Sequence, residues 1–102
     1  MLGIVTKRFK HYVLTYNYVA DMVNKRGPYR DAHISYAKDF ESKGLLLGGA
    51  LQNPVDSGLL IFDAAEQDVV HYAENDPYNK NGLIKSYSVR EIMFAFGYQK
   101  PK

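Results

Sequence analysis

The chain has 102 residues, a formal net charge of +2 and no cysteine. This length suits a single domain, and the lack of thiols excludes disulfides, thiolate catalysis and cysteine-based metal sites. The small, scattered charge argues against a nucleic-acid-binding surface, and no stretch approaches the roughly 20 apolar residues that a membrane-spanning helix needs. Nine tyrosines and no tryptophan suit half-buried pockets and subunit interfaces.

Residues 1–20 contain no acidic side chain, a feature shared with some organelle-targeting segments. Arginine is sparse there and serine is absent, so we expect a cytoplasmic protein and keep organelle targeting as the alternative. Residues 9–16 are rich in β-branched and aromatic side chains and predict a first strand. Residues 17–26 are mixed and predict a loop or a short helical turn.

A helix is predicted over residues 29–43. Its apolar side chains recur with the 3.6-residue period of one helix face. Pro28 stands just before the helix, and Gly44 can cap its end. The side chains of that face are Tyr29, Ala32, His33, Tyr36, Ala37 and Phe40.

Two strands follow, joined by a loop of moderate length. Residues 45–51 predict the first, and its glycine pair, Gly48-Gly49, indicates a bulge or a close approach to the backbone. Residues 59–62 predict a second, buried strand. Together the two strands predict a hairpin.

A second helix is predicted over residues 63–75, with Asp63 as its cap and Glu66 at capping-box spacing. Asp76 ends it, because a residue before proline disfavours helical geometry. Residues 84–96 predict a long last strand. Apolar side chains stand on both sides of its end, so we expect both faces to be covered there.

The resulting order of strand, helix, strand, strand, helix, strand is that of the ferredoxin-like α+β fold, an antiparallel sheet with two helices on one face. A second copy of the chain would cover the other face, so we expect a homodimer. We predict one domain over residues 1–102, with a core of about residues 9–96 and flexible ends.

Two residues are candidates for acid/base chemistry. His33 lies on the apolar side of the predicted helix, where it is either a structural residue or an imidazole that takes up a proton near neutral pH. Asp76 either only caps and ends a helix, or presents a carboxylate that orients His33. The sequence leaves the distance between them open.

Other candidate sites have less support. His11 and His71 could join His33 in a three-histidine metal site, but their spacing matches no ligand motif. Ser57 lacks the setting of an activated nucleophile, and the glycine pair lacks the partner residues of a phosphate-binding loop. We therefore predict no metal and no cofactor.

Three motifs, in order and at this spacing, resemble the YCII-related (YciI-like) family. They are the R-x-x-H segment Arg30–His33, the glycine-containing run Lys43–Leu51, and the D-P-Y segment that ends at Tyr78. The resemblance spans roughly residues 9–96.

The resemblance implies a dimeric α+β barrel with a cleft in each subunit, in which His33 and Asp76 form the active centre and Arg30 binds an anionic group of a small molecule. The family's best-understood chemistry is dehydrochlorination of a hydroxylated aromatic ring. We therefore expect a cofactor-free enzyme of elimination or isomerisation type. Further substrate contacts are expected from Tyr36, Tyr78 and Gly49.

Two alternatives share this fold. One is a non-catalytic ligand-binding or accessory protein, whose ligand binds and is never consumed. The other is a cofactor-free monooxygenase, which would consume oxygen with a quinol substrate. The loop over residues 52–58 is shorter than in some family members, which affects the expected size of the pocket.

Overall fold

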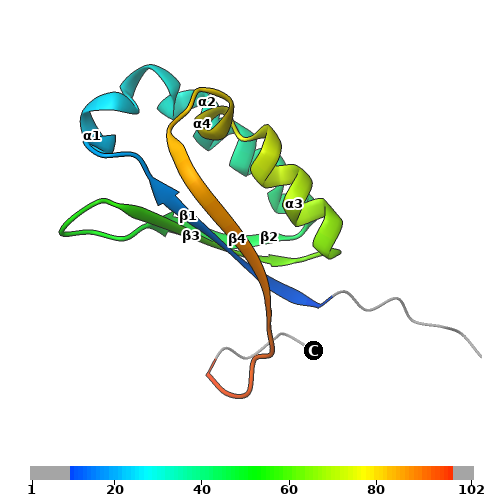
Figure 1. Ribbon diagram of the computed structural model, residues 1–102. Coiled ribbons are helices and arrows are strands. Elements are labelled where there is room, and N and C mark those ends of the chain that lie inside the picture. Colours follow the sequence, from blue (N-terminus) through cyan, green and yellow to red (C-terminus); the bar gives the residue numbers. More distant parts are fainter. Residues whose placement is uncertain (1–9, 98–102) are drawn as a thin grey trace, which may run out of the picture.

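A computed structural model describes residues 10–97. Its four strands form one antiparallel sheet in the order β2-β3-β1-β4, and the main helices cover one face of it (Figure 1). This arrangement confirms the predicted ferredoxin-like α+β fold. The elements in chain order are β1 (His11–Tyr18), α1 (Met22–Lys25), α2 (Gly27–Asp39), the single-turn helix η1 (Glu41–Lys43), β2 (Leu45–Ala50), β3 (Ser57–Asp63), α3 (Glu66–Asn75), α4 (Pro77–Lys80) and β4 (Ile84–Ile92).

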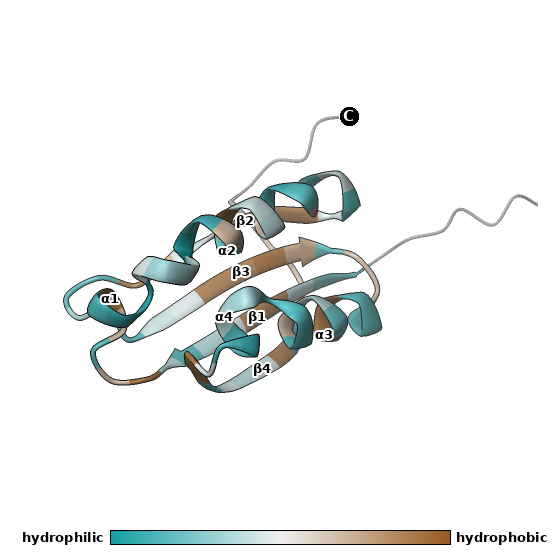
Figure 2. Cartoon of the chain, turned by 90° about the horizontal axis from the view of Figure 1, so that it is seen from above, coloured by the Kyte–Doolittle hydropathy of each residue, from teal (hydrophilic) through white to brown (hydrophobic). Residues whose placement is uncertain are grey.

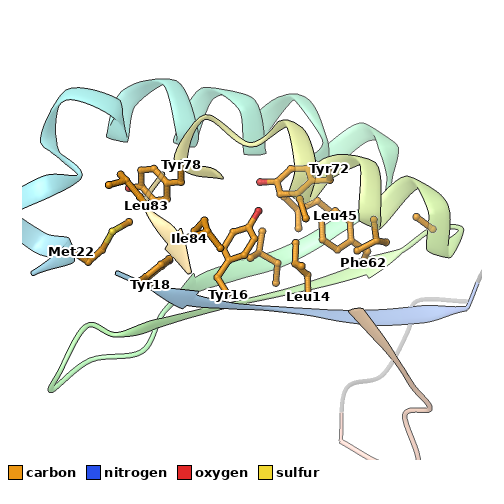
Figure 3. Close-up of a cluster of buried hydrophobic side chains, with 14 residues drawn as sticks. Leu14, Tyr16, Tyr18, Met22, Leu45, Phe62, Tyr72, Tyr78, Leu83 and Ile84 are labelled. Carbon is orange, nitrogen blue, oxygen red and sulfur yellow. The ribbon is translucent and has the colours of Figure 1, made fainter. Parts of the chain in front are cut away.

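The core lies between the sheet and the helices (Figure 3). Alternate residues of β1 point into it, because successive side chains of a strand face opposite sides. Leu14 and Tyr16 are 0% exposed, and Leu14 pairs with Leu60 of β3, which is also buried. Figure 2 shows hydrophobic residues along β3 and hydrophilic ones over much of the helices' outer surface. The helices contribute Met22, Val69, Tyr72, Ala73 and Tyr78 to the same core.

The first long helix is shifted from its predicted span. α2 begins at Gly27, so Pro28 lies within its first turn, where its missing N–H costs little. It ends at Asp39, and residues 41–43 form the separate η1 turn before Gly44, whose φ is +110°. The predicted apolar face is half-buried except at Ala32, which is exposed.

The predicted start of the second helix is wrong. Asp63 is the last residue of β3 and pairs with His11 of β1, so the sheet ladder holds it and it does not cap the helix. α3 begins three residues later at Glu66, and its N-cap residue is Ala65. Backbone pairing outweighs the local capping pattern here.

The ends of the strands also differ from the prediction. β1 runs two residues further, to Tyr18, and α1 provides the helical turn expected between residues 17 and 26. β4 ends at Ile92, and the following Met93 and Phe96 are 83% and 90% exposed in the single chain. Within the single chain these two side chains are therefore uncovered, and their burial in an assembly of two copies stays a prediction.

The predicted flexible ends, residues 1–9 and 98–102, lie outside the described residues, as does Phe9 of the predicted first strand. Within residues 10–97, none of the helices has the length and hydropathy needed to cross a bilayer.

Candidate active site

Asp76 lies at the junction between α3 and α4. Because Pro77 disfavours helical geometry in the residue before it, Asp76 leaves the helix with φ −61° and ψ 131°. In this extended conformation it is the N-cap of α4, and its Oδ1 accepts a hydrogen bond from the Tyr78 backbone N–H at 2.9 Å. The Asp-Pro-Tyr segment therefore ends one helix, begins the next and fixes a carboxylate between them.

The Asp76 side chain is 0% exposed, and two further groups reach its carboxylate. The Tyr16 hydroxyl, from β1, donates to Oδ2 at 2.8 Å. His33 Nδ1, from α2, lies 2.8 Å from Oδ1 and 3.1 Å from Oδ2. A buried carboxylate needs such donors to replace water. The structure thus brings His33 and Asp76, which the sequence could not place, into direct contact.

The His33 ring is held on a second side by Tyr78. The two rings stack with their centroids 3.7 Å apart and an angle of 5° between their planes. The His33 side chain is 17% exposed, so one edge of the ring faces the buried carboxylate while the rest borders a cleft. Stacking and hydrogen bonding together restrict the ring to one orientation.

The cleft lies between α2 and the edge strand β2 and has a volume of about 320 Å³. That volume is at the lower end of the range for small-molecule sites. His33, Arg30 and Ala37 line it from α2, Leu45 to Ala50 line it from β2, and Tyr78 lies beside His33. The predicted site residues Arg30, Tyr78 and Gly49 all reach this cleft.

Positive charge dominates the cleft. Arg26, Arg30 and Lys38 line it, against a single acidic residue, Glu41. Among the residues that the structure describes, none of the three cations forms an ion pair with a carboxylate. A cleft with uncompensated cations attracts an anionic ligand.

Two tyrosines mark the end of the cleft nearest the arginines. Burial raises the pKa of Tyr18 to about 12, with Tyr78 and Asp76 acting in the same direction and Arg26 opposing them. Burial also raises the pKa of Tyr78, opposed by Arg26 and Arg30. Both phenols therefore stay protonated near neutral pH and can donate hydrogen bonds beside the guanidinium groups.

The glycine pair of β2 has two different roles. A Cβ added at Gly48 would lie 2.9 Å from Leu60 Cγ, so glycine permits a close approach to the neighbouring strand. A Cβ at Gly49 would meet nothing within 4 Å. The strand's register irregularity lies earlier, between Leu45 and Leu47, so the pair marks close packing and not a bulge.

The structure does not bring Tyr36 to the cleft. Its hydroxyl donates to the Tyr72 backbone carbonyl at 3.0 Å, and its ring stacks on the Tyr72 ring with centroids 4.7 Å apart. Tyr36 therefore supports the helix layer behind the cleft.

The three histidines lie on separate elements. His11 Nε2 is 3.9 Å from Asp63 Oδ2, and His71 is exposed on α3 and contacts Asn75. In the described part of the chain, no three histidine, aspartate or glutamate side chains gather in a way that could hold a metal ion. Ser57 is the first residue of β3 and not part of the predicted turn, and its hydroxyl donates to the neighbouring Asp56 carboxylate at 2.7 Å.

Sequence reasoning missed Tyr16 and Arg26. Tyr16 alternates with Leu14 and Tyr18 in β1, a pattern that places its ring in the core but does not reveal its polar partner 60 residues away. Arg26 stands directly before the Gly27-Pro28 start of α2. This position, close to the R-x-x-H segment, is a signal that could have linked it to the cleft.

The family model of the YCII-related domain matches residues 10–93. Among solved structures, the chain is similar to 5-chloro-2-hydroxyhydroquinone dehydrochlorinase (TftG) from Burkholderia phenoliruptrix AC1100, determined in complex with 2,5-dihydroxybenzoquinone. The two share 22% sequence identity and a TM-score of 0.70, over 81% of this chain and 93% of that chain. None of the curated proteins compared with the sequence matches it. Because the family model spans most of the chain and the solved structure shares its fold, the resemblance seen in the sequence is confirmed, and this chain belongs to the YCII-related family.

Proposed function

We propose that this chain is a small enzyme that uses His33 and Asp76 for acid/base chemistry of elimination or isomerisation type, on a small anionic and planar substrate. The observation that carries the proposal is the 2.8 Å contact between His33 Nδ1 and the fully buried Asp76 carboxylate, beside a cleft that the same histidine lines.

The pairing sets the tautomer of the imidazole. An ionised carboxylate can only accept hydrogen bonds, so Nδ1 carries the proton in this contact and Nε2 keeps its lone pair. Nε2 is then the nitrogen that can take a proton from a substrate in the cleft. Asp76 would stabilise the imidazolium that forms, which is the role of the carboxylate in other histidine–carboxylate pairs.

The cleft suits a single-ring anion. A planar ring can lie in the narrow space between α2 and β2, against Leu45 and the stacked His33 and Tyr78 rings. Arg26 and Arg30 can neutralise a phenolate or carboxylate, and the Tyr18 hydroxyl can add a hydrogen bond. A hydroxylated aromatic acid or a hydroxyquinol has these properties.

The reaction needs only proton transfers and a leaving group. Nε2 removes a proton from a substrate hydroxyl or carbon, and the released electron pair moves into the conjugated system. In an elimination, the leaving group departs with its own electron pair; in an isomerisation, the imidazolium returns the proton to another atom. TftG, which shares this fold, is named as a dehydrochlorinase, and dehydrochlorination is an elimination; this supports the proposed reaction type.

The test is turnover of 5-chloro-2-hydroxyhydroquinone and a panel of hydroxylated aromatic acids, followed by chloride release and ultraviolet absorbance. The His33→Gln variant should lose at least about a hundredfold in rate, the contribution expected of a general base. His71→Gln is the matched control, because His71 is exposed on α3, and should keep the wild-type rate. Equal rates for His33→Gln and wild type would refute the assignment.

The same fold could serve a ligand-binding protein without catalysis. In that case the panel would yield a compound that binds in the cleft, in an Arg30-dependent manner, and is never converted. Consumption of oxygen with a quinol would instead indicate a monooxygenase.

We also infer that the chain forms a homodimer through the outer face of the sheet. That face is free of helices in the single chain (Figure 1), and it carries partly exposed apolar side chains that are neighbours across the strands, such as Val13 and Ile61. Leu47, opposite Ile61, is 57% exposed. Burying such a face against a second copy removes apolar surface from water.

A further inference from the structure

We propose that Tyr16 is a positioning residue for the His33–Asp76 pair, and that its hydroxyl sets the proton affinity of the pair. The inference rests on the proposed function for its catalytic meaning, but its contacts are independent of any substrate. Tyr16 is 0% exposed and does not line the cleft, so it cannot touch a bound ligand. It acts only through Asp76.

Tyr16 provides the main hydrogen bond to one of the two carboxylate oxygens. Asp76 Oδ1 accepts from His33 Nδ1 at 2.8 Å and from the Tyr78 N–H at 2.9 Å. Oδ2 accepts from the Tyr16 hydroxyl at 2.8 Å, and its other contact is the longer 3.1 Å approach of His33 Nδ1. Without the Tyr16 hydroxyl, the carboxylate could rotate about its last bond and weaken the short contact to His33.

The Tyr16 hydroxyl stays protonated near neutral pH, so it remains a donor there. Its pKa lies well above the ordinary value of 10.0, first because of burial and then because of the neighbouring Asp76 charge and the hydrogen bond to it. Figure 3 shows the Tyr16 ring rising from β1 with its hydroxyl oxygen in the layer between sheet and helices. Tyr16 therefore stabilises the carboxylate as an anion and takes no part as a base.

A hydrogen bond that stabilises the carboxylate weakens its hold on the histidine proton. In wild type, the Tyr16 hydroxyl and His33 both donate to the Asp76 carboxylate, so the carboxylate attracts the protonated imidazole less strongly than it would without Tyr16. In the Tyr16→Phe variant, the less stabilised carboxylate holds the imidazolium more strongly. The proton-loss step of the pair should therefore move to higher pH, whichever member is assigned the proton.

Other charged and titratable groups face this pair and are unchanged in the variant. They are Tyr18 of β1, Arg26 and Arg30 at the start of α2, Tyr36 of α2, Tyr72 of α3, Tyr78 of α4, and Lys38 and Glu41 farther along the cleft.

Tyr72 provides a matched control. It is also 0% exposed, and the Asp76 charge contributes to raising its pKa, as it does for Tyr16. However, its hydroxyl has no hydrogen-bond partner among the residues that the structure describes. Tyr72→Phe therefore removes a buried hydroxyl from the same neighbourhood without removing a hydrogen bond to Asp76.

The experiment is NMR titration of the His33 ring in wild type, Tyr16→Phe, Tyr72→Phe and Asp76→Asn. For Tyr16→Phe we expect the midpoint of the His33 titration to rise by about half a pH unit to one pH unit, because part of the free energy of the lost charge-assisted hydrogen bond is transmitted to the histidine. For Tyr72→Phe we expect the midpoint to change by less than about 0.2 pH units. If a substrate is found, the acid limb of its kcat/KM profile should shift in the same direction.

An unchanged midpoint in Tyr16→Phe, or an equal shift in both phenylalanine variants, overturns the inference. If Asp76→Asn moves the midpoint and Tyr16→Phe does not, the inference alone fails and the proposed pair survives. If neither moves it, both fail. A second observation on the wild type is the Tyr16 hydroxyl proton itself, which should resonate far downfield and disappear in Asp76→Asn.

Discussion

Alkaline pH should destabilise this chain because four of its core residues, Tyr16, Tyr18, Tyr72 and Tyr78, are tyrosines whose pKa is raised by burial. Tyr16 and Tyr72 are 0% exposed and Tyr18 is 7% exposed. Burial raises the pKa of Tyr18 to about 12, and it raises those of Tyr16 and Tyr72 further. The folded state therefore prefers the protonated phenols more strongly than the unfolded state does.

The sign and size of the effect follow from this difference. The stabilisation is fully present below pH 10, the ordinary tyrosine pKa, and is lost as the pH rises from 10 towards 12 and above. At pH 11, Tyr16, Tyr18 and Tyr72 should each lower the free energy of unfolding by about 1.4 kcal/mol, or by about 4 kcal/mol together. This is a large share of the roughly 5–15 kcal/mol by which small domains are stable.

The assay is urea unfolding followed by circular dichroism in steps from pH 8 to pH 11, with tyrosinate absorbance recorded in parallel. Tyr72→Phe should reduce the loss at pH 11 by about 1.4 kcal/mol, since it removes one such group. Tyr87→Phe, which alters an exposed hydroxyl beside Glu74, should keep most of the wild-type slope. A free energy of unfolding that stays flat to pH 11, or a Tyr72→Phe slope equal to wild type, would refute this reasoning.

Three further predictions follow from the cleft and the sheet. On the proposed function, 2,5-dihydroxybenzoquinone, the ligand of TftG, is a probe for the cleft. Arg30→Ala should weaken its binding about fivefold by calorimetry, the effect of losing about 1 kcal/mol from a partly exposed charge pair, whereas Lys25→Ala on α1, outside the cleft, should leave it unchanged. Ile61→Glu on the outer face of the sheet should convert the proposed homodimer into a monomer in light scattering, and an unaltered mass would count against that interface. Gly48→Ala should cost about 1–3 kcal/mol in urea unfolding because its Cβ meets Leu60, while Gly49→Ala should be nearly neutral; the reverse order would contradict the packing described for β2.

The order of the elements could be predicted because it depends on short-range patterns. The strand pattern predicted for residues 9–16 and the helical period after residue 28 both reflect which side chains face the core, and the described residues of both segments pack in that way. The element ends were less predictable. Asp63 looks like a helix cap, but its backbone belongs to the sheet ladder with His11, a partner that local spacing does not reveal.

The individual residues of the candidate site could be predicted from the sequence, but their arrangement in space could not. His33 and Asp76 could be selected by residue type and motif, but their contact spans 43 residues of sequence and depends on how α2 packs beside α4. Tyr16 was missed for the same reason, since its inward position predicts burial and says nothing of its partner. Tyr36 lies on the same side of α2 as His33, and the sequence therefore predicts it as a substrate contact. Its ring instead packs on Tyr72 behind the cleft.

The measurement that tests the account most directly is the NMR titration of the His33 ring in wild type and in Asp76→Asn. The 2.8 Å contact with a buried carboxylate predicts that the imidazolium loses its partner charge in the variant, so His33 should titrate at a lower pH than in wild type, with the fold intact by circular dichroism. If His33 titrates at the same pH in both proteins, the two residues are not coupled, Asp76 serves only as the cap of α4, and the histidine–aspartate pair cannot be the working centre of this chain.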